Sequence, residues 1–124
     1  MTASEEALRR LTIGEPAYCR KVMSTGVNDA LPSLDARSVA LLRLGGAIAA
    51  GSTRPIWQQR VSDALDAGLS FDDIVSSLLA LAPTIGLDRV VAVAPDLAHA
   101  LGYDIDAVLE QLPPPGPTPA GSRA

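Results

Sequence analysis

The chain has 124 residues, a net charge of −4 and a hydrophobic content of 48% that comes mostly from Ala, Leu and Val. A chain of this length buries roughly two thirds of the surface that it exposes when unfolded, so we expect one domain that needs no disulfide or metal to fold. The acidic balance argues against a nucleic acid partner, because such binding depends on clustered Lys and Arg.

The apolar runs are too short for a membrane helix, and the start of the chain lacks the pattern of a signal peptide. The longest uncharged apolar run is residues 44–50, whereas a bilayer span needs about 20 residues. We therefore expect no membrane partner and a cytoplasmic location.

Helix signals divide the first quarter of the chain into two helices and a loop. Two acidic residues directly after Ser4 favour the positive end of a first helix, which the glycine at Gly14 ends. Pro16 at a first-turn position predicts a second helix that runs to about Gly26. Residues 27–33 contain Asn, Asp and Pro and are predicted to form a loop.

Two more helices are predicted in the centre of the chain. Residues 33–35 supply a cap for a long helix that runs to about Gly51. This helix is apolar on every side over residues 39–50, which is typical of a buried helix. Thr53, or the serine before it, begins a helix that has a proline in its first turn and ends at Gly68.

Cap and breaker residues also define the helices that follow. Ser70, with Asp73 three residues later, predicts a capping box at the start of a helix over 71–85. A further helix is predicted over 87–102. We expect Pro95 to bend or break it, because proline removes a backbone hydrogen bond.

The last part of the chain changes in composition. A short helix over 104–112 is predicted to complete a helical domain of residues 1–112. Residues 113–124 are rich in Pro and Gly and cannot pack, so we expect a disordered tail. No stretch alternates polar and apolar residues long enough to suggest a strand. The predicted fold class is therefore all-α, a single-domain bundle of about six helices.

Two arginines are predicted to lie on apolar helix faces. A projection of the helix that ends at Gly68, at about 100° per residue, places Arg60 near the middle of an apolar arc that includes Ile56 and Trp57. Arg43, in the long helix before it, has leucines on both sides. A guanidinium keeps its charge, so each must pair with a carboxylate, reach water along its stem or bind an anion. Both an internal ion pair and an anion pocket with Trp57 as an apolar wall stay open.

His99 and Cys19 are the only histidine and the only cysteine. We expect His99 to be exposed, because it falls beside Asp88 and Asp96 on the polar side of its helix. Cys19 is expected to be a small buried residue. One histidine and one cysteine cannot form a metal site with normal ligand spacing, and neither a nucleophile elbow nor a nucleotide-binding Gly-rich loop is present. The sequence predicts no metal and no cofactor.

Several short motifs occur in order within residues 33–103: L-D-A-R at 34–37, V-S-D-A-L-D-A-G at 61–68, F-D-D-I-V at 71–75 and A-P-x-x-G at 82–86. Together they resemble the carboxymuconolactone decarboxylase and alkylhydroperoxidase D superfamily. The resemblance implies an alkylhydroperoxidase D-like helical bundle that assembles as a homotrimer or a hexamer.

The residues that the resemblance would make functional are replaced in this chain. The peroxidase branch has a C-x-x-C motif, a histidine four residues after it and an upstream glutamate. Counting back from Gly68 places the cysteines at Thr53 and Ile56, the histidine at Arg60 and the glutamate near residue 40 or 41. Dithiol peroxidase chemistry is excluded, because a hydroxyl and a hydrocarbon cannot form a disulfide. Arginine is no general base near neutral pH, but it can hold a carboxylate or stabilise an oxyanion.

Three functions follow as expectations. In the first, the chain binds a small anionic or apolar metabolite, with or without a non-redox decarboxylation, isomerisation or cyclisation. Its site would have Arg60 as the catalytic charge and, as ligand-binding residues, Arg43, Trp57, Ile56 and Thr53. The second is a non-catalytic oligomeric scaffold or binding module in which Arg60 forms an ion pair. The third is a peroxidase activity that depends on Cys19.

Overall fold

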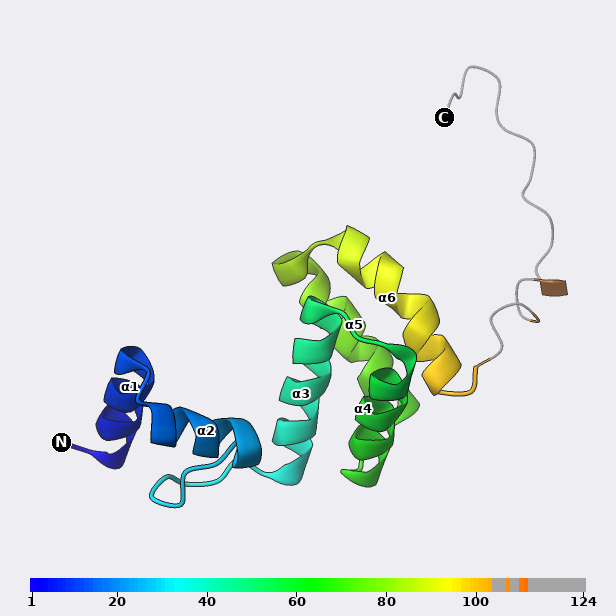
Figure 1. The fold of residues 1–124 in the computed structure, drawn as a ribbon. Helices are drawn as coiled ribbons and strands as arrows, with labels where there is room; N and C mark the ends of the chain where they lie inside the picture. Colours follow the sequence, from blue (N-terminus) through cyan, green and yellow to red (C-terminus); the bar gives the residue numbers. More distant parts are fainter. Residues whose placement is uncertain (104–106, 108–109, 112–124) are drawn as a thin grey trace. The chain divides into compact units, whose positions relative to one another are not determined.

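The computed structural model describes residues 1–103, 107, 110 and 111, and these residues form α-helices and no strand (Figure 1). The all-α class predicted from the sequence is confirmed for this part of the chain. In chain order the helices are α1 (Ala3–Ile13), α2 (Pro16–Thr25), α3 (Ala36–Ala50), α4 (Arg54–Asp66), α5 (Phe71–Ile85) and α6 (Leu87–Ala100). Most of the short helix predicted over 104–112, and the tail predicted over 113–124, lie outside the described residues.

The chain divides into two units, Met1–Ala36 and Arg37–Ala124. The first unit contains α1 and α2. The second contains nearly all of α3, together with α4, α5 and α6.

The first unit begins with a capping box that lies earlier than predicted. The Thr2 hydroxyl accepts a hydrogen bond from the Glu5 N–H at 3.1 Å, and the Thr2 N–H donates to the Glu5 carboxylate at 2.7 Å. The helix therefore begins before Ser4, because T-x-x-E satisfies two free N–H groups together. Gly14 and Gly26 end α1 and α2 with positive φ, as their positions in the sequence predicted.

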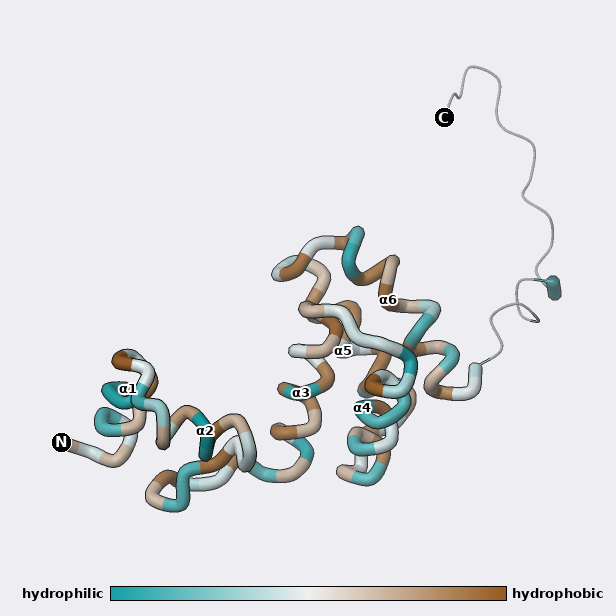
Figure 2. Tube along the Cα trace, in the orientation of Figure 1, coloured by the Kyte–Doolittle hydropathy of each residue, from teal (hydrophilic) through white to brown (hydrophobic). Residues whose placement is uncertain are grey.

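The second unit has one hydrophobic core, to which all four of its helices contribute. Helix α6 packs against both α4 and α5. The largest side chains with less than 2% exposure are Trp57, Leu44, Ile48, Ile74, Leu97 and Val61. Much of α5, which packs on this core, is coloured as hydrophobic in Figure 2.

Helix α3 is not buried on every side, so that prediction was wrong. Its buried residues are Ala40, Leu44, Ala47 and Ile48, which share one face, whereas Leu42 is exposed. The core meets only the face with the spacing i, i+4, i+7 and i+8. A helix whose other side is apolar but uncovered has the same sequence pattern as a fully buried helix.

The apolar arc predicted for α4 is also only partly buried, and so are the apolar residues of α6. Ile56 and Leu65 of α4 are exposed, as are Leu87 and Val91 of α6. The residues of α6 that enter the core are Val90, Val93 and Leu97. On each helix the apolar surface is wider than the strip that a neighbouring helix covers.

Helix α6 continues through Pro95, so the predicted break does not occur. Pro95 cannot donate to the carbonyl of Val91, but both residues are exposed. Water can therefore hydrogen-bond to that carbonyl, which lowers the cost of the missing bond.

No single described helix is long and apolar enough to cross a membrane, although α4 and α5 together, bent by 119° where they meet, reach the required length and composition.

Candidate functional site

Helix α4 and its cap carry four of the five residues predicted to form a site, but these do not share one surface. Trp57 is only 1% exposed and belongs to the core of the second unit. Ile56 is exposed, and Thr53 is an exposed N-cap whose side chain makes no capping hydrogen bond. Because Trp57 is covered by core residues, it does not present a ring face to solvent beside Ile56.

Arg60 is half-buried and Arg43 is exposed. Neither guanidinium forms a hydrogen bond or an ion pair with any residue that the structure describes. Arg60 is the more unusual of the two, because it lies one turn after Trp57 and one turn before Ala64, which are both buried. A permanent charge therefore lies next to the core without a carboxylate from the described part of the chain.

A groove of about 200 Å³ lies between α5 and α6. Its lining comes from α5, from α6 and from the residues directly after α6. The residues are Phe71, Ile74, Val75, Leu78, Ala94, Leu97, Ala98, Leu101 and Tyr103. None of the residues predicted to form a site belongs to this lining.

The helical repeat brings these residues to one groove. Residues 71, 74, 75 and 78 of α5 have the spacing i, i+3, i+4 and i+7, and residues 94, 97, 98 and 101 repeat it at α6. Two of these α6 residues, Ala94 and Ala98, have short side chains. They leave space that larger side chains would fill, and the space becomes the groove.

The start of α5 is fixed by a capping box, as predicted. The Ser70 hydroxyl accepts from the Asp73 N–H at 3.1 Å, and the Ser70 N–H donates to the Asp73 carboxylate at 2.8 Å. Arg37 adds an ion pair to Asp73 at 3.1 Å. The backbone hydrogen bond from Ser70, followed by that from Arg37, lowers the pKa of Asp73 from 3.8 to about 2. Phe71, the first residue of the helix, is thereby placed at the groove.

The end of α6 places the other aromatic residue of the lining. The Gly102 N–H donates to the His99 carbonyl at 3.0 Å, and the Tyr103 N–H donates to the Ala98 carbonyl at 2.9 Å. Gly102 has a φ of +74°, so these bonds form a Schellman motif that turns the chain back over the last turn of the helix. The side chain at Tyr103 consequently lies at the groove.

Phe71 and Tyr103 form an aromatic pair. Their ring centroids are 6.0 Å apart and the ring planes are tilted by 52°. This geometry is within the range that aromatic pairs prefer. Phe71 is 46% exposed and Tyr103 is 43% exposed, so the pair is open to solvent.

The chemistry of the lining is almost entirely hydrocarbon. Among its nine side chains, the Tyr103 hydroxyl is the only polar group. This hydroxyl forms no hydrogen bond with the described residues. The lining contributes no carboxylate, amine, imidazole or thiol, so its described side chains can bind an apolar molecule but supply no nucleophile and no general base near neutral pH.

The groove could not be recognised in the sequence, because its residues have the same spacing as the residues of a buried helix face. The signal that could have indicated it is the width of the apolar arcs on both helices, together with an aromatic residue at the start of α5 and another after α6. A groove also depends on how two helices approach each other, which the sequence does not give.

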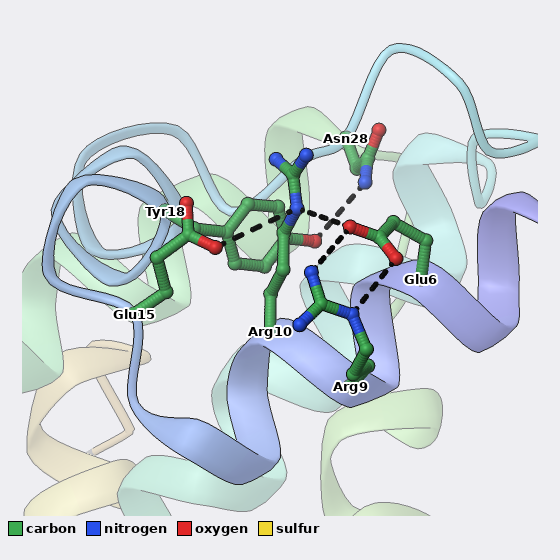
Figure 3. A network of polar contacts seen from close by, with 6 residues as sticks. All are labelled: Glu6, Arg9, Arg10, Glu15, Tyr18 and Asn28. Carbon is green, nitrogen blue, oxygen red and sulfur yellow. Dashed lines mark hydrogen bonds and ion pairs between the residues drawn. The ribbon is translucent and has the colours of Figure 1, made fainter.

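A polar network stabilises the first unit (Figure 3). Glu6 accepts hydrogen bonds from Arg9 at 2.8 Å and 3.0 Å and from Arg10 at 2.8 Å. The hydrogen bond from Arg9, followed by that from Arg10, lowers the pKa of Glu6 from 4.5 to about 2. Arg10 also lies 5.4 Å from the ring centre of Tyr18, and the Tyr18 hydroxyl accepts from Asn28 at 3.0 Å. These contacts join α1, α2 and the loop after α2.

Neither His99 nor Cys19 is among the residues that line the groove. His99 is exposed, as predicted. Cys19 is half-buried in the first unit, and so is less covered than predicted. Among the described residues, no three His, Cys, Asp or Glu side chains gather where they could hold a metal ion.

No family model, curated protein or solved structure matches this chain. The resemblance to the carboxymuconolactone decarboxylase and alkylhydroperoxidase D superfamily stays a prediction from the sequence motifs.

Proposed function

We propose that this protein binds a small, uncharged, apolar molecule in the α5–α6 groove. The hydrocarbon lining is the observation that carries the proposal. Ligand sites are concave and mostly apolar, with few polar groups. An apolar cavity of about 150 Å³ is large enough for benzene. The groove measures about 200 Å³ and so has room for one substituted ring or a branched chain of similar size.

In this proposal the groove binds its ligand and does not catalyse a reaction. Catalysis needs a positioned acid, base or nucleophile, and the described lining offers only a phenol. The apolar walls favour ligands without charge, because a charged group loses its hydration there and gains no partner. We therefore propose a small-molecule binding protein with an apolar metabolite as its ligand.

Filling the groove tests this function. Ala98→Leu adds three carbons inside the lining, whereas Ala92→Leu adds the same atoms on the exposed side of the same helix. We expect toluene to shift the amide NMR signals of the lining residues in the wild type and in Ala92→Leu. In Ala98→Leu the affinity for toluene should fall at least about tenfold, because the added side chain occupies the ligand volume.

Circular dichroism of each variant checks that the helices still form. Toluene binding that is equally strong in Ala98→Leu and Ala92→Leu would contradict the proposal. So would a wild-type protein whose lining signals do not respond to toluene.

A second candidate function is the binding of a small carboxylate at Arg60, as expected from the sequence. The observation that favours it is a half-buried arginine whose guanidinium forms no hydrogen bond or ion pair with the described residues. Such a charge is stabilised by an anion. Ile56 lies one turn before Arg60 and the N-cap Thr53 two turns before it, so in this proposal both contact part of the bound molecule. Bound there, the carboxylate of a substrate could be held for a non-redox reaction.

A pair of arginine variants on one helix tests this second candidate. Arg60→Gln removes the half-buried charge, and Arg54→Gln removes an exposed charge from the same helix. We expect benzoate to change the Trp57 fluorescence of the wild type and of Arg54→Gln, but not that of Arg60→Gln. If Arg60→Gln responds to benzoate with unchanged affinity, Arg60 does not bind carboxylates.

We further propose that the chain is a divergent, cytoplasmic member of the carboxymuconolactone decarboxylase and alkylhydroperoxidase D superfamily that has lost the dithiol. The order and spacing of the motifs over residues 33–103 support this membership, and an all-helical fold is compatible with it. Assembly as a homotrimer or a hexamer belongs to the same proposal.

A further inference from the structure

Tyr103 combines a fixed backbone with a free hydroxyl. Its N–H donates to the Ala98 carbonyl at 2.9 Å, and the preceding Gly102 has the positive φ that this turn requires. In contrast, its hydroxyl has no hydrogen-bond partner among the residues that the structure describes. The backbone of Tyr103 is therefore fixed beside the groove, and its hydroxyl is the one donor and acceptor among the described side chains of the lining.

The aromatic pair next to this hydroxyl favours a ring as the ligand. Phe71 and Tyr103 are tilted by 52° with 6.0 Å between their centroids. A third ring can meet either of them in the edge-to-face or offset geometry that aromatic groups prefer, which an aliphatic molecule of the same volume cannot do. The branched side chains at Ile74 and Leu78 supply the apolar contacts for the rest of the molecule.

We infer that the ligand of the α5–α6 groove is a small, uncharged aromatic molecule with one hydrogen-bonding group, such as a phenol, and that the Tyr103 hydroxyl recognises that group. This inference rests on the proposed function, because it names the class of molecule that the same groove binds. Tyr103 acts in it as a residue that determines specificity. A net hydrogen bond of this kind contributes roughly 0.5–1.5 kcal/mol, which corresponds to a difference in affinity of about 2- to 12-fold.

Two probes that differ by one hydroxyl group test the inference. Toluene and p-cresol share the ring and the methyl group, so the ratio of their dissociation constants isolates the contribution of the hydroxyl. We expect the ratio of the two dissociation constants in Tyr103→Phe to shift about fivefold against p-cresol, relative to the ratio in the wild type. Toluene and p-cresol are hydrated differently, but this difference is the same for both proteins. It therefore cancels when the ratio in the variant is divided by the ratio in the wild type.

Tyr18→Phe is the matched control, because it removes the hydroxyl of the other tyrosine, which lies in the first unit and accepts a hydrogen bond from Asn28. We expect its ratio of dissociation constants to equal that of the wild type. Methylcyclohexane, which has the carbon skeleton of toluene without the aromatic ring electrons, should bind less tightly than toluene.

The outcomes separate this inference from the proposed function. Toluene binding with the same ratio in Tyr103→Phe and in the wild type would overturn the role of Tyr103 and leave the groove as an apolar site. Methylcyclohexane binding as tight as that of toluene would overturn the preference for a ring. If neither toluene nor p-cresol binds and light scattering shows a self-association that Ala98→Leu abolishes, the groove is an interface between copies of the chain and both proposals fail.

Discussion

Asp73 shows how a single residue at a helix start can influence a site from outside its lining. Its carboxylate accepts from the Ser70 N–H at the first turn of α5 and pairs with Arg37 of α3. Phe71, which lines the groove, lies between Ser70 and Asp73 in the sequence. The hydrogen bonds that fix this turn therefore also fix the backbone from which the Phe71 side chain reaches the groove.

The lowered pKa of Asp73 predicts a pH dependence of stability. The pKa is about 2 in the folded chain and 3.8 ordinarily, so the ionised carboxylate is favoured by folding. Its contribution is fully present above about pH 3.8 and is lost as the pH falls through about 2. We expect Asp73→Asn to lower the urea midpoint at pH 6 more than at pH 2.5.

Asp72→Asn is the control for this measurement. Asp72 is exposed in the same helical turn but makes no hydrogen bond or ion pair with the described residues. Its substitution should change the urea midpoint much less at pH 6. A difference between wild type and Asp73→Asn that is as large at pH 2.5 as at pH 6 would refute the linkage.

Among the helices, the residues at the helix ends determine which side chains reach the groove. The Schellman motif after α6 needs a left-handed residue at Gly102, which has a φ of +74°. A Cβ atom there would meet nothing within 4 Å, so the backbone conformation alone sets the cost of a substitution. Without this turn the chain would not return Tyr103 to the last turn of α6.

Two glycine variants should change stability in opposite directions. Gly102→Ala is expected to lower the free energy of unfolding by about 1 kcal/mol, because alanine is strained at positive φ. Gly46→Ala, inside α3 with open space around its Cβ position, should raise it by about 0.5–1 kcal/mol. Urea unfolding measures both values. A Gly102→Ala variant as stable as the wild type would show that the turn tolerates a side chain.

At the scale of the whole molecule, the second unit leaves several large apolar side chains in contact with solvent. Leu42, Leu79, Leu87 and Val91 are each more than 60% exposed. Exposed apolar patches often mark surfaces at which proteins associate. The proposed homotrimer or hexamer would cover such surfaces.

Light scattering after gel filtration tests the proposed assembly. We expect a mass of three or six times 12.8 kDa at micromolar concentration. Val91→Lys should lower that mass, because a charge would be buried without a partner. Gln58→Lys, at an exposed position of α4 between Arg54 and Ser62, should leave the mass unchanged. A wild-type chain that elutes as a monomer would contradict the assembly but not the fold.

The helical class and most helix ends could be predicted from the sequence alone. Pro16, the capping box of Ser70 with Asp73, and the glycines at 14 and 26 were found where predicted. These signals are local, because a cap satisfies N–H groups within one turn and glycine adopts positive φ by itself. The same local chemistry would have located the start of α1 at Thr2, had its T-x-x-E spacing been recognised.

Which apolar side chains are buried by neighbouring helices depends on the tertiary structure and could not be predicted from the sequence. The arc of α4 contained both Trp57 and Ile56, but the first lies in the core and the second in solvent. The groove beside Ala94 and Ala98 likewise exists only because α5 and α6 meet with short side chains between them. Burial depends on the direction from which neighbouring helices approach, and an apolar arc wider than that contact leaves its remaining residues free to bind something else.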